Sequence, residues 1–93
     1  HLTEDGAMRI KILGSGCSKC IMLADNTRRA LDNMGRDAEI VKVTDLTEIA
    51  MLGVMSTPAL AIDDVVVSTG RVLAPKSIED LILAHDAGLH GNG

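Results

Sequence analysis

The sequence contains no Phe, Tyr or Trp, and this absence restricts both the core and the partners of the protein. Without aromatic rings, the apolar 46% of the chain consists of Leu, Ile, Val, Ala, Met and Cys, which must form the core. Proteins that hold single-stranded nucleic acid usually stack its bases on aromatic side chains. Acidic residues outnumber basic ones by 13 to 9, and neither sign forms a long block. We therefore expect no nucleic-acid partner.

Long hydrophobic runs are also missing from the chain. No run approaches the ~20 apolar residues that cross a bilayer, and the polar start has neither region of a secretory signal. These absences predict a cytoplasmic protein without membrane contact. The length of 93 residues favours one domain, which we expect to be monomeric and to cover residues 8–87. Residues 1–7 are expected to be a flexible extension or a tag remnant, and residues 88–93 a frayed tail.

Hydrophobic periodicity and turn residues predict seven secondary-structure elements. Alternation of apolar and polar residues indicates strands, and apolar residues three or four apart indicate helices. The predicted elements are a strand at 8–13, a helix at 17–34, a strand at 37–43, a short helix opened by the capping pair Asp45 and Glu48, strands at 59–62 and 65–68 joined by a tight turn at Asp63 and Asp64, and a helix at 75–87 that begins with Pro75.

The predicted order, β-α-β-α-β-β-α, defines an α/β fold. A helix between two strands forms a βαβ unit with a right-handed crossover, so the first two strands are expected to be parallel. The last two strands form a hairpin, so the whole sheet should be mixed and four-stranded, with helices on both faces. The inward stripe of the first helix is expected to be Ile21, Ala24, Arg28, Leu31 and Met34.

Spacing and composition also suggest which other side chains pack inside. Met22, Met51 and Met55 are expected to fill gaps in a core without aromatic rings rather than to line a peptide groove. Residues 65–67 should form an ordinary core strand rather than a sheet edge. His85 follows the apolar spacing of the last helix, which favours a partly buried packing residue over a metal ligand.

The only two cysteines, Cys17 and Cys20, lie three residues apart where the first long helix begins. A disulfide that closes so short a loop adds little stability, so a purely structural role is disfavoured. Unpaired N–H groups and the dipole at a helix N-terminus favour a thiolate, and Ser18 and Lys19 are placed to assist. The pattern predicts Cys17 as an exposed nucleophile and Cys20 as the shielded resolving thiol, with no cofactor beyond their redox-active disulfide.

The segment Gly-Ser-Gly-Cys-Ser-Lys-Cys at residues 14–20, with Thr57-Pro58 before the third strand and Gly70 after the fourth, resembles the thioredoxin and glutaredoxin superfamily. The similarity is closest to the small redox-active disulfide proteins and covers residues 8–87. It implies a thioredoxin-like fold and a thiol–disulfide oxidoreductase whose substrate is a disulfide-containing protein or a small thiol. A thioredoxin-reductase-like enzyme or glutathione would supply the electrons.

The same resemblance implies a substrate-binding surface. Pro58 would follow a cis peptide bond and face the cysteine pair, and Thr57 would pair with an extended substrate through backbone hydrogen bonds. Gly16, Gly70 and Arg71 complete the implied set, with Arg71 as the residue for glutathione. Where thioredoxins carry Trp before the first cysteine and Gly-Pro between the two, this chain has glycine and Ser-Lys, so the particular substrates of thioredoxin are not implied.

Three other interpretations stay open: a carrier of soft metals, a structural zinc site and a binding module without redox chemistry. A ferredoxin-like carrier of soft metals also places two cysteines between a first strand and helix, and its thiolates bind Cu(I) or Zn(II). Its order, βαββαβ, ends on a strand instead of a helix. A structural zinc site would need four ligands, and the histidines that could join the cysteines are His1, His85 and His90. The third class is a binding module that has this fold but inert cysteines.

Overall fold

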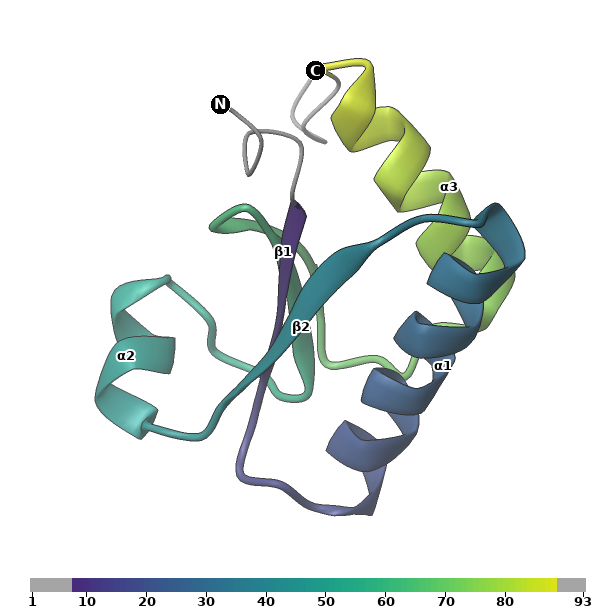
Figure 1. Cartoon of the computed structure of the whole chain (residues 1–93). Coiled ribbons are helices and arrows are strands. Elements are labelled where there is room, and N and C mark those ends of the chain that lie inside the picture. Colours follow the sequence, from purple (N-terminus) through teal and green to yellow (C-terminus); the bar gives the residue numbers. More distant parts are fainter. Residues whose placement is uncertain (1–7, 89–93) are drawn as a thin grey trace.

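The computed structural model describes residues 8–88 and contains the seven predicted elements in the predicted order (Figure 1). The expected extension at residues 1–7 and residues 89–93 of the expected tail lie outside the described residues. No helix within the described range combines the length and the apolar character needed to span a membrane. The elements are β1 (Met8–Leu13), α1 (Ser18–Met34), β2 (Ala38–Val43), α2 (Leu46–Met51), β3 (Ala59–Ile62), β4 (Val65–Thr69) and α3 (Pro75–Asp86).

The four strands form one mixed sheet in the order β2-β1-β3-β4. β1 runs parallel to β2, as expected for a βαβ unit, and antiparallel to β3. All four residues of β3 are buried, whereas β4 lies at the sheet edge and is at most half-buried. The prediction of an ordinary core strand at residues 65–67 is therefore wrong, because β4 pairs with β3 on one side only.

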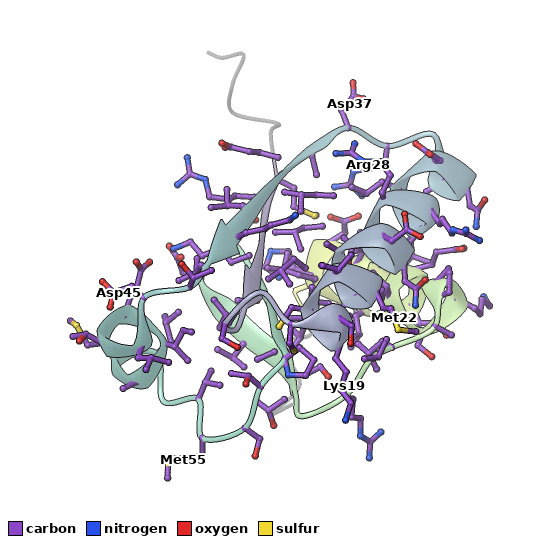
Figure 2. The ribbon with its side chains drawn as sticks, turned by 90° about the horizontal axis from the view of Figure 1, so that it is seen from below. Lys19, Met22, Arg28, Asp37, Asp45 and Met55 are labelled. Carbon is purple, nitrogen blue, oxygen red and sulfur yellow. The ribbon has the colours of Figure 1, made fainter. Side chains whose placement is uncertain are left out.

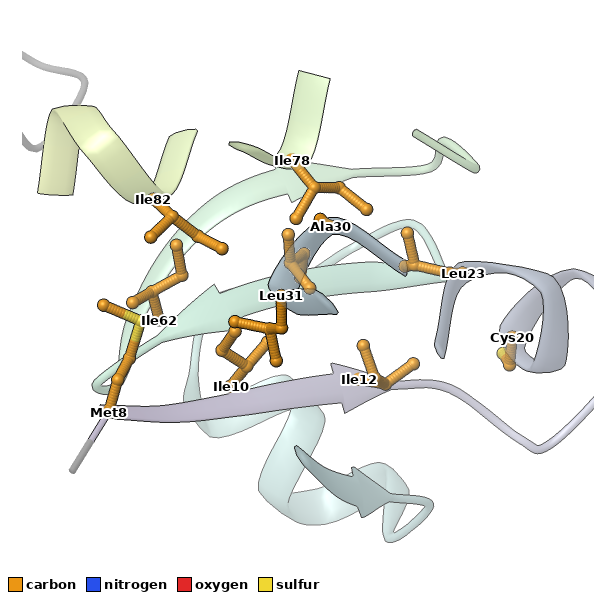
Figure 3. Close-up of a cluster of buried hydrophobic side chains, with 11 residues drawn as sticks. Met8, Ile10, Ile12, Cys20, Leu23, Ala30, Leu31, Ile62, Ile78 and Ile82 are labelled. Carbon is orange, nitrogen blue, oxygen red and sulfur yellow. The ribbon is translucent and has the colours of Figure 1, made fainter. Parts of the chain in front are cut away.

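Helices cover both faces of the sheet, with α1 and α3 on one face and α2 on the other (Figure 1). Side chains alternate along a strand, so β1 contributes to both cores. Its Ile10 and Ile12 pack with α1 and α3 in the larger cluster, which Figure 3 shows. Leu13 belongs to a second cluster with Val43 and Ile49 on the side of α2. The burial of these aliphatic side chains is the main favourable contribution to folding.

The buried face of α1 differs from the predicted stripe. Its buried side chains are Cys20, Leu23, Thr27, Ala30 and Leu31. Of the predicted stripe only Leu31 is among them, and Arg28 is exposed. A stripe centred on Arg28 would bury a guanidinium without a partner, which is costly, whereas the Thr27 hydroxyl donates to the Leu23 carbonyl at 2.8 Å. The helix is therefore rotated so that Cys20 faces the core.

The hairpin between β3 and β4 is built as predicted. Asp63 and Asp64 have φ angles of 49° and 70°, and two successive left-handed residues are the mark of a type I′ turn. The turn is also held from outside: the Lys11 ammonium lies 2.7 Å from the Asp64 carboxylate. His85 Nε2 lies 3.0 Å from the Asp63 carboxylate, and the His85 side chain is largely buried, as its spacing predicted.

The start of α2 forms only half of the predicted capping box. Asp45 accepts a hydrogen bond from the Thr47 N–H at 2.9 Å, which satisfies one unpaired donor of the first turn. The Glu48 carboxylate, expected to bond back to Asp45, instead lies 3.7 Å from the ammonium of Lys11. This ion pair links α2 to the central strand of the sheet.

Candidate functional site

The two cysteines lie together at the N-terminus of α1. Their sulfur atoms are 3.7 Å apart, and both thiols are free in this structure. Cys17 is the N-cap residue and is exposed, whereas Cys20, one turn further along, is 6% exposed and lies at the end of the larger cluster (Figure 3). The sequence predicts this difference in exposure. A disulfide bond is about 2 Å long, so a small movement of the side chains can join the two sulfurs.

The surroundings of Cys17 favour its thiolate. Hydrogen bonds from the backbone N–H of Cys20, from the Cys20 thiol and from the backbone N–H of Lys19 hold the pKa of the Cys17 thiol below its usual value. Partial removal from water acts in the opposite direction and is a smaller effect. Because N–H groups in the first turn have no partner within the helix, they are available to a thiolate at the N-cap. The contribution of Lys19 comes from its backbone.

The sulfur of Cys20 rests directly against the backbone of Gly14. A Cβ atom at Gly14 would lie only 2.3 Å from Cys20 Sγ, closer than real Cβ contacts allow. The same Cβ would lie 3.5 Å from Thr57 Cβ, so the end of β1, the buried cysteine and the segment before β3 meet here. The Gly14 N–H also donates to the Val43 carbonyl at 2.9 Å. Glycine is needed at this position because the backbone and the sulfur approach so closely.

The Thr57-Pro58 segment comes close to the end of β1 at Gly14, against which the Cys20 sulfur rests. Its peptide bond is cis, Thr57 is exposed and Pro58 is buried. The Pro58 carbonyl accepts a hydrogen bond from the Gly70 N–H at 2.9 Å. Gly70 has a φ of 71°, and a Cβ there would lie 3.2 Å from Ser56 Cβ. Gly70 is therefore connected to Pro58 through the backbone, and Thr57 is the residue of this segment that lies beside Gly14, against which the Cys20 sulfur rests.

A cavity of about 150 Å³ opens beside Cys20. Its walls come from the end of β1, the start of α1 and the end of β2 with the residue after it: Ile12, Gly14, Gly16, Cys20, Ile21, Lys42 and Thr44. Most of these side chains are apolar, and Lys42 is the charged one among them. The predicted site residue Gly16 thus lies at the cavity together with the buried thiol.

Gly14, Lys42 and Thr44 are the site residues that the sequence reasoning missed. Gly14 belongs to the motif at residues 14–20, but the sequence does not predict its contact with the Cys20 sulfur. The alternation of β2 could have indicated Lys42, because it lies on the same face of the strand as Ala38 and Ile40, which pack against the larger cluster. The register places Lys42 beside Ile12, which is 2% exposed.

Arg71 and the methionines lie away from this arrangement or differ from expectation. Arg71 lines a second, open groove of about 720 Å³ between β4 and α3, whose lining includes neither cysteine. Met22, Met51 and Met55 are 54%, 82% and 95% exposed, so the prediction that they fill gaps in the core is wrong. Figure 2 shows Met22 and Met55 on the surface. The interior is filled mainly by Leu, Ile, Val and Ala together with Met8 and Cys20, because the small domain has little volume to fill.

The described residues add no further ligand to the two cysteines for the metal-site interpretations. Residues 8–88 contain no group of three or more His, Cys, Asp and Glu side chains that could hold a metal ion. His85 bonds to Asp63 in the β3–β4 turn, and His1 and His90 lie outside the described residues. The described elements also end in strand, strand and helix, which differs from the ferredoxin-like order.

The fold and the site together define a class of protein. A mixed four-stranded sheet with helices on both faces carries two thiols at the N-terminus of its first helix, next to a cis-proline segment. This combination characterises the thioredoxin superfamily.

Comparison with known proteins agrees with this class. A family model described as the thioredoxin domain matches residues 8–83, and the chain belongs to the thioredoxin family. It is 45% identical over 71 residues to a thioredoxin of Methanocaldococcus jannaschii, a match that covers 76% of this chain and 81% of the relative. It is 36% identical over 75 residues to a thioredoxin of Methanothermobacter thermautotrophicus, with 81% and 97% covered. These similarities support a thioredoxin-like redox role of the oxidoreductase type.

Proposed function

We propose that this protein is a dithiol–disulfide oxidoreductase that uses Cys17 and Cys20 to exchange electrons with a disulfide-containing protein or a small thiol. One observation carries the proposal: an exposed Cys17 thiol with a lowered pKa lies 3.7 Å from a buried Cys20 thiol. The first thiol is reactive and accessible to a partner, and the second is accessible only to the first. The thioredoxin-like redox role of the family supports the same chemistry.

The reaction proceeds in two exchange steps. The Cys17 thiolate attacks one sulfur of the partner disulfide, a bond forms between them, and the other partner sulfur leaves as a thiolate that takes a proton from solvent. Cys20 then loses its proton to solvent and attacks Cys17 Sγ. The bond from Cys17 to the partner breaks, and the Cys17–Cys20 disulfide forms. Two electrons have passed to the partner, which becomes a dithiol, and the protein dithiol has been oxidised.

The surrounding residues have proposed roles in binding and activation. Ser18 and Lys19 open α1 and help to stabilise the Cys17 thiolate, Lys19 through its backbone N–H. The exposed Thr57 offers its backbone to an extended substrate. The buried Pro58 supports it from behind, and the exposed Gly70 is bonded to the Pro58 carbonyl.

Gly16 and Arg71 have proposed roles in binding the substrate and the electron donor. Gly16 has no side chain to obstruct an approaching disulfide, and its φ of 86° keeps the loop in a conformation that favours glycine. Arg71 lies in the groove beyond Gly70, where its guanidinium would bind a glutathione carboxylate. A thioredoxin-reductase-like enzyme or glutathione returns the electrons. We place the reaction in the cytoplasm, where glutathione and thioredoxin keep thiols reduced.

Two serine variants test the proposal. With insulin as the disulfide substrate and dithiothreitol as the electron donor, Cys17→Ser should abolish reduction, because the attacking sulfur is gone. Cys20→Ser should trap a mixed disulfide that is visible as added mass under non-reducing conditions. Asp37→Asn, at an exposed position between α1 and β2, is the control and should keep full activity. Full reductase activity in both cysteine variants would contradict the assignment.

A redox titration distinguishes this function from metal transport. The protein is equilibrated in dithiothreitol buffers of defined potential, its thiols are alkylated, and the mass is measured beside an assay for copper and zinc. We expect a reversible two-electron transition in metal-free protein. Stoichiometric metal without an accessible disulfide would instead support a soft-metal carrier.

A further inference from the structure

Charge is distributed unevenly around the cysteine pair of this acidic protein. The chain carries 13 Asp and Glu against 9 Lys and Arg, a formal net charge of −4. The segments that form the site and its borders nevertheless contain no acidic residue. They are residues 14–24, 40–44, 52–62 and 65–78. Every carboxylate side chain therefore belongs to another part of the chain.

The basic side chains near the site are also those without an acidic partner. Ion pairs within residues 8–88 engage most of the Lys and Arg side chains, namely Arg9, Lys11, Arg29, Arg36 and Lys76. The others form no ion pair with a described residue, and all of them are exposed: Lys19, Arg28, Lys42 and Arg71. Of these, Lys19, Lys42 and Arg71 border the site, and we call these three the site cations.

Two of the site cations reach the cysteines from different elements. Lys19 lies in the first turn of α1, between the two cysteines in the sequence, as Figure 2 shows for its side chain. Lys42 comes from β2 and lines the same small cavity as Cys20. The positive end of the α1 dipole acts in the same direction. The exposed Cys17 thiol therefore lies in a region of positive potential.

Arg71 extends this region toward the cis-proline segment. It follows Gly70, whose N–H donates to the Pro58 carbonyl at 2.9 Å. The Asn26 side chain donates to the Leu73 carbonyl at 2.9 Å, which holds the same loop against α1. A substrate that lies along the cis-proline segment would therefore have Arg71 at its border.

The carboxylates that border this region are engaged by other groups. Asp80 lines the groove of Arg71, but its carboxylate lies 3.2 Å from the Lys76 ammonium. These contacts leave the charges of the site cations largely uncompensated. The other border carboxylates and their partners are Asp25 with Arg29, Glu39 with Arg9, Glu48 with Lys11, and Asp45 with the Thr47 N–H.

We propose that the cysteine site selects partner proteins whose disulfide is flanked by acidic residues. This inference rests on the proposed oxidoreductase function and names its substrate class. An extended chain advances about 3.3–3.6 Å per residue, so carboxylates two or three residues from the disulfide lie about 7–10 Å from it. This distance is close to the Debye length of about 8 Å at physiological ionic strength, so the site cations attract these carboxylates while Cys17 attacks. The cations take no part in the bonds that form and break.

The net charge of the protein and the charge of its site predict opposite preferences. If the net charge of −4 decided the encounter, a basic partner would react faster. The site cations favour an acidic partner, because they are the charges that the flanking residues of the disulfide approach. The sign of the preference therefore tells the two effects apart.

Two matched peptides measure the preference. They share one neutral sequence with an intramolecular disulfide and carry either two Glu or two Lys residues on each side of it. Reduction by the reduced protein, without glutathione, is quenched with acid and followed by mass. Each rate is divided by the rate of the same peptide with dithiothreitol, a neutral dithiol, which removes the intrinsic reactivity of the disulfide.

The variants separate the site cations from other basic residues. The test variant combines Lys19→Gln with Arg71→Gln, and the Lys19 backbone N–H is kept. Lys42 stays unchanged because it also lines the cavity of the buried thiol. The matched control is Arg28→Gln, because Arg28 is also exposed and outside any described ion pair, but lies about 13.5 Å along α1 from Lys19.

The readout is the ratio of the two normalised rates. In the unmodified protein at low salt, the Glu peptide should react about tenfold faster than the Lys peptide, and about 0.5 M salt should bring the ratio close to one. The double variant should lower the ratio by about threefold to tenfold, and Arg28→Gln should keep it. A general change in Cys17 reactivity affects both peptides equally and leaves the ratio unchanged.

Three results would refute the selection of acidic partners by these residues. They are a ratio of one or less in the unmodified protein at low salt, an unchanged ratio in the double variant, and an equal loss of preference in Arg28→Gln. Failure of the proposed function itself would look different, because neither peptide would then be reduced.

Discussion

The contact between Gly14 and Cys20 allows a sharp prediction about how the buried thiol is seated. In Gly14→Ala, the new methyl group would lie 2.3 Å from Cys20 Sγ, and ordinary contact begins at about 3.4 Å. The sulfur or the end of β1 must therefore move by about 1 Å. Gly14 is buried and its N–H is bonded to Val43, so the backbone cannot shift without loss of sheet pairing.

The expected loss of stability in Gly14→Ala is that seen when other protein cores are overpacked. Forcing an extra methyl group into a packed site costs about 1–3 kcal/mol of the free energy of unfolding. For a domain of this size, each kcal/mol corresponds to a decrease of about 4–8 °C in Tm. Urea unfolding of the reduced protein measures the loss directly. A displaced sulfur should also make Cys20 react faster with an alkylating reagent in the folded protein.

A double-mutant cycle isolates the responsible contact. Cys20→Ala removes the sulfur atom, and the next neighbour of the new methyl group is then Thr57 Cβ at 3.5 Å, an ordinary distance. In this background, Gly14→Ala should cost much less than in the unmodified protein. If the cost is equal in both backgrounds, the close approach of sulfur and backbone is not the reason for glycine at this position.

Two further predictions concern the reactive thiol and the core. The lowered pKa of Cys17 means that its thiolate persists below pH 8.5, which is about the pKa of a free cysteine. Its rate of alkylation should therefore stay high as the pH falls through about 8.5 and should decline only at lower pH. A pH midpoint of alkylation at or above that of a free cysteine would contradict the hydrogen-bonded arrangement. Leu31→Ala should lower the free energy of unfolding by about 2–5 kcal/mol, because Leu31 is 1% exposed in the larger cluster, whereas Leu83→Ala on the exposed side of α3 should change it by less than about 0.5 kcal/mol in urea titrations. Equal effects at the two leucines would contradict the described core.

The order of elements was predictable because it depends on local patterns. Alternation marks β1, Pro75 marks the first residue of α3, and the Asp63-Asp64 pair marks a hairpin turn, each within a few residues of sequence. The cysteine pair was found for the same reason, since its spacing and its place before a helix are local features. The exposure of Cys17 and the burial of Cys20 were predictable because Cys17 lies in the loop before the helix and Cys20 lies one turn further along it.

The rotation of α1 about its axis and the burial of single side chains were harder to predict, because both depend on residues that are distant in the sequence. The phase of α1 was wrong because a spacing rule accepts Arg28 in an apolar stripe, while the packed structure rejects it and accepts Thr27. The lack of aromatic residues predicts Met22, Met51 and Met55 inside, yet all three are exposed, whereas Met8 is buried. Composition states which residues are available for a core and cannot state which of them reach it.

The sequence by itself thus determined the succession of strands and helices, the class of fold and the position of the two thiols along the chain. Only the tertiary structure decided what surrounds these thiols. Gly14, Lys42 and Cys20 are separated by up to 28 residues, and the parallel pairing of β1 with β2 brings them to one cavity. The physical reason is that local periodicity describes which face of an element is apolar, whereas a site is formed where faces of different elements meet.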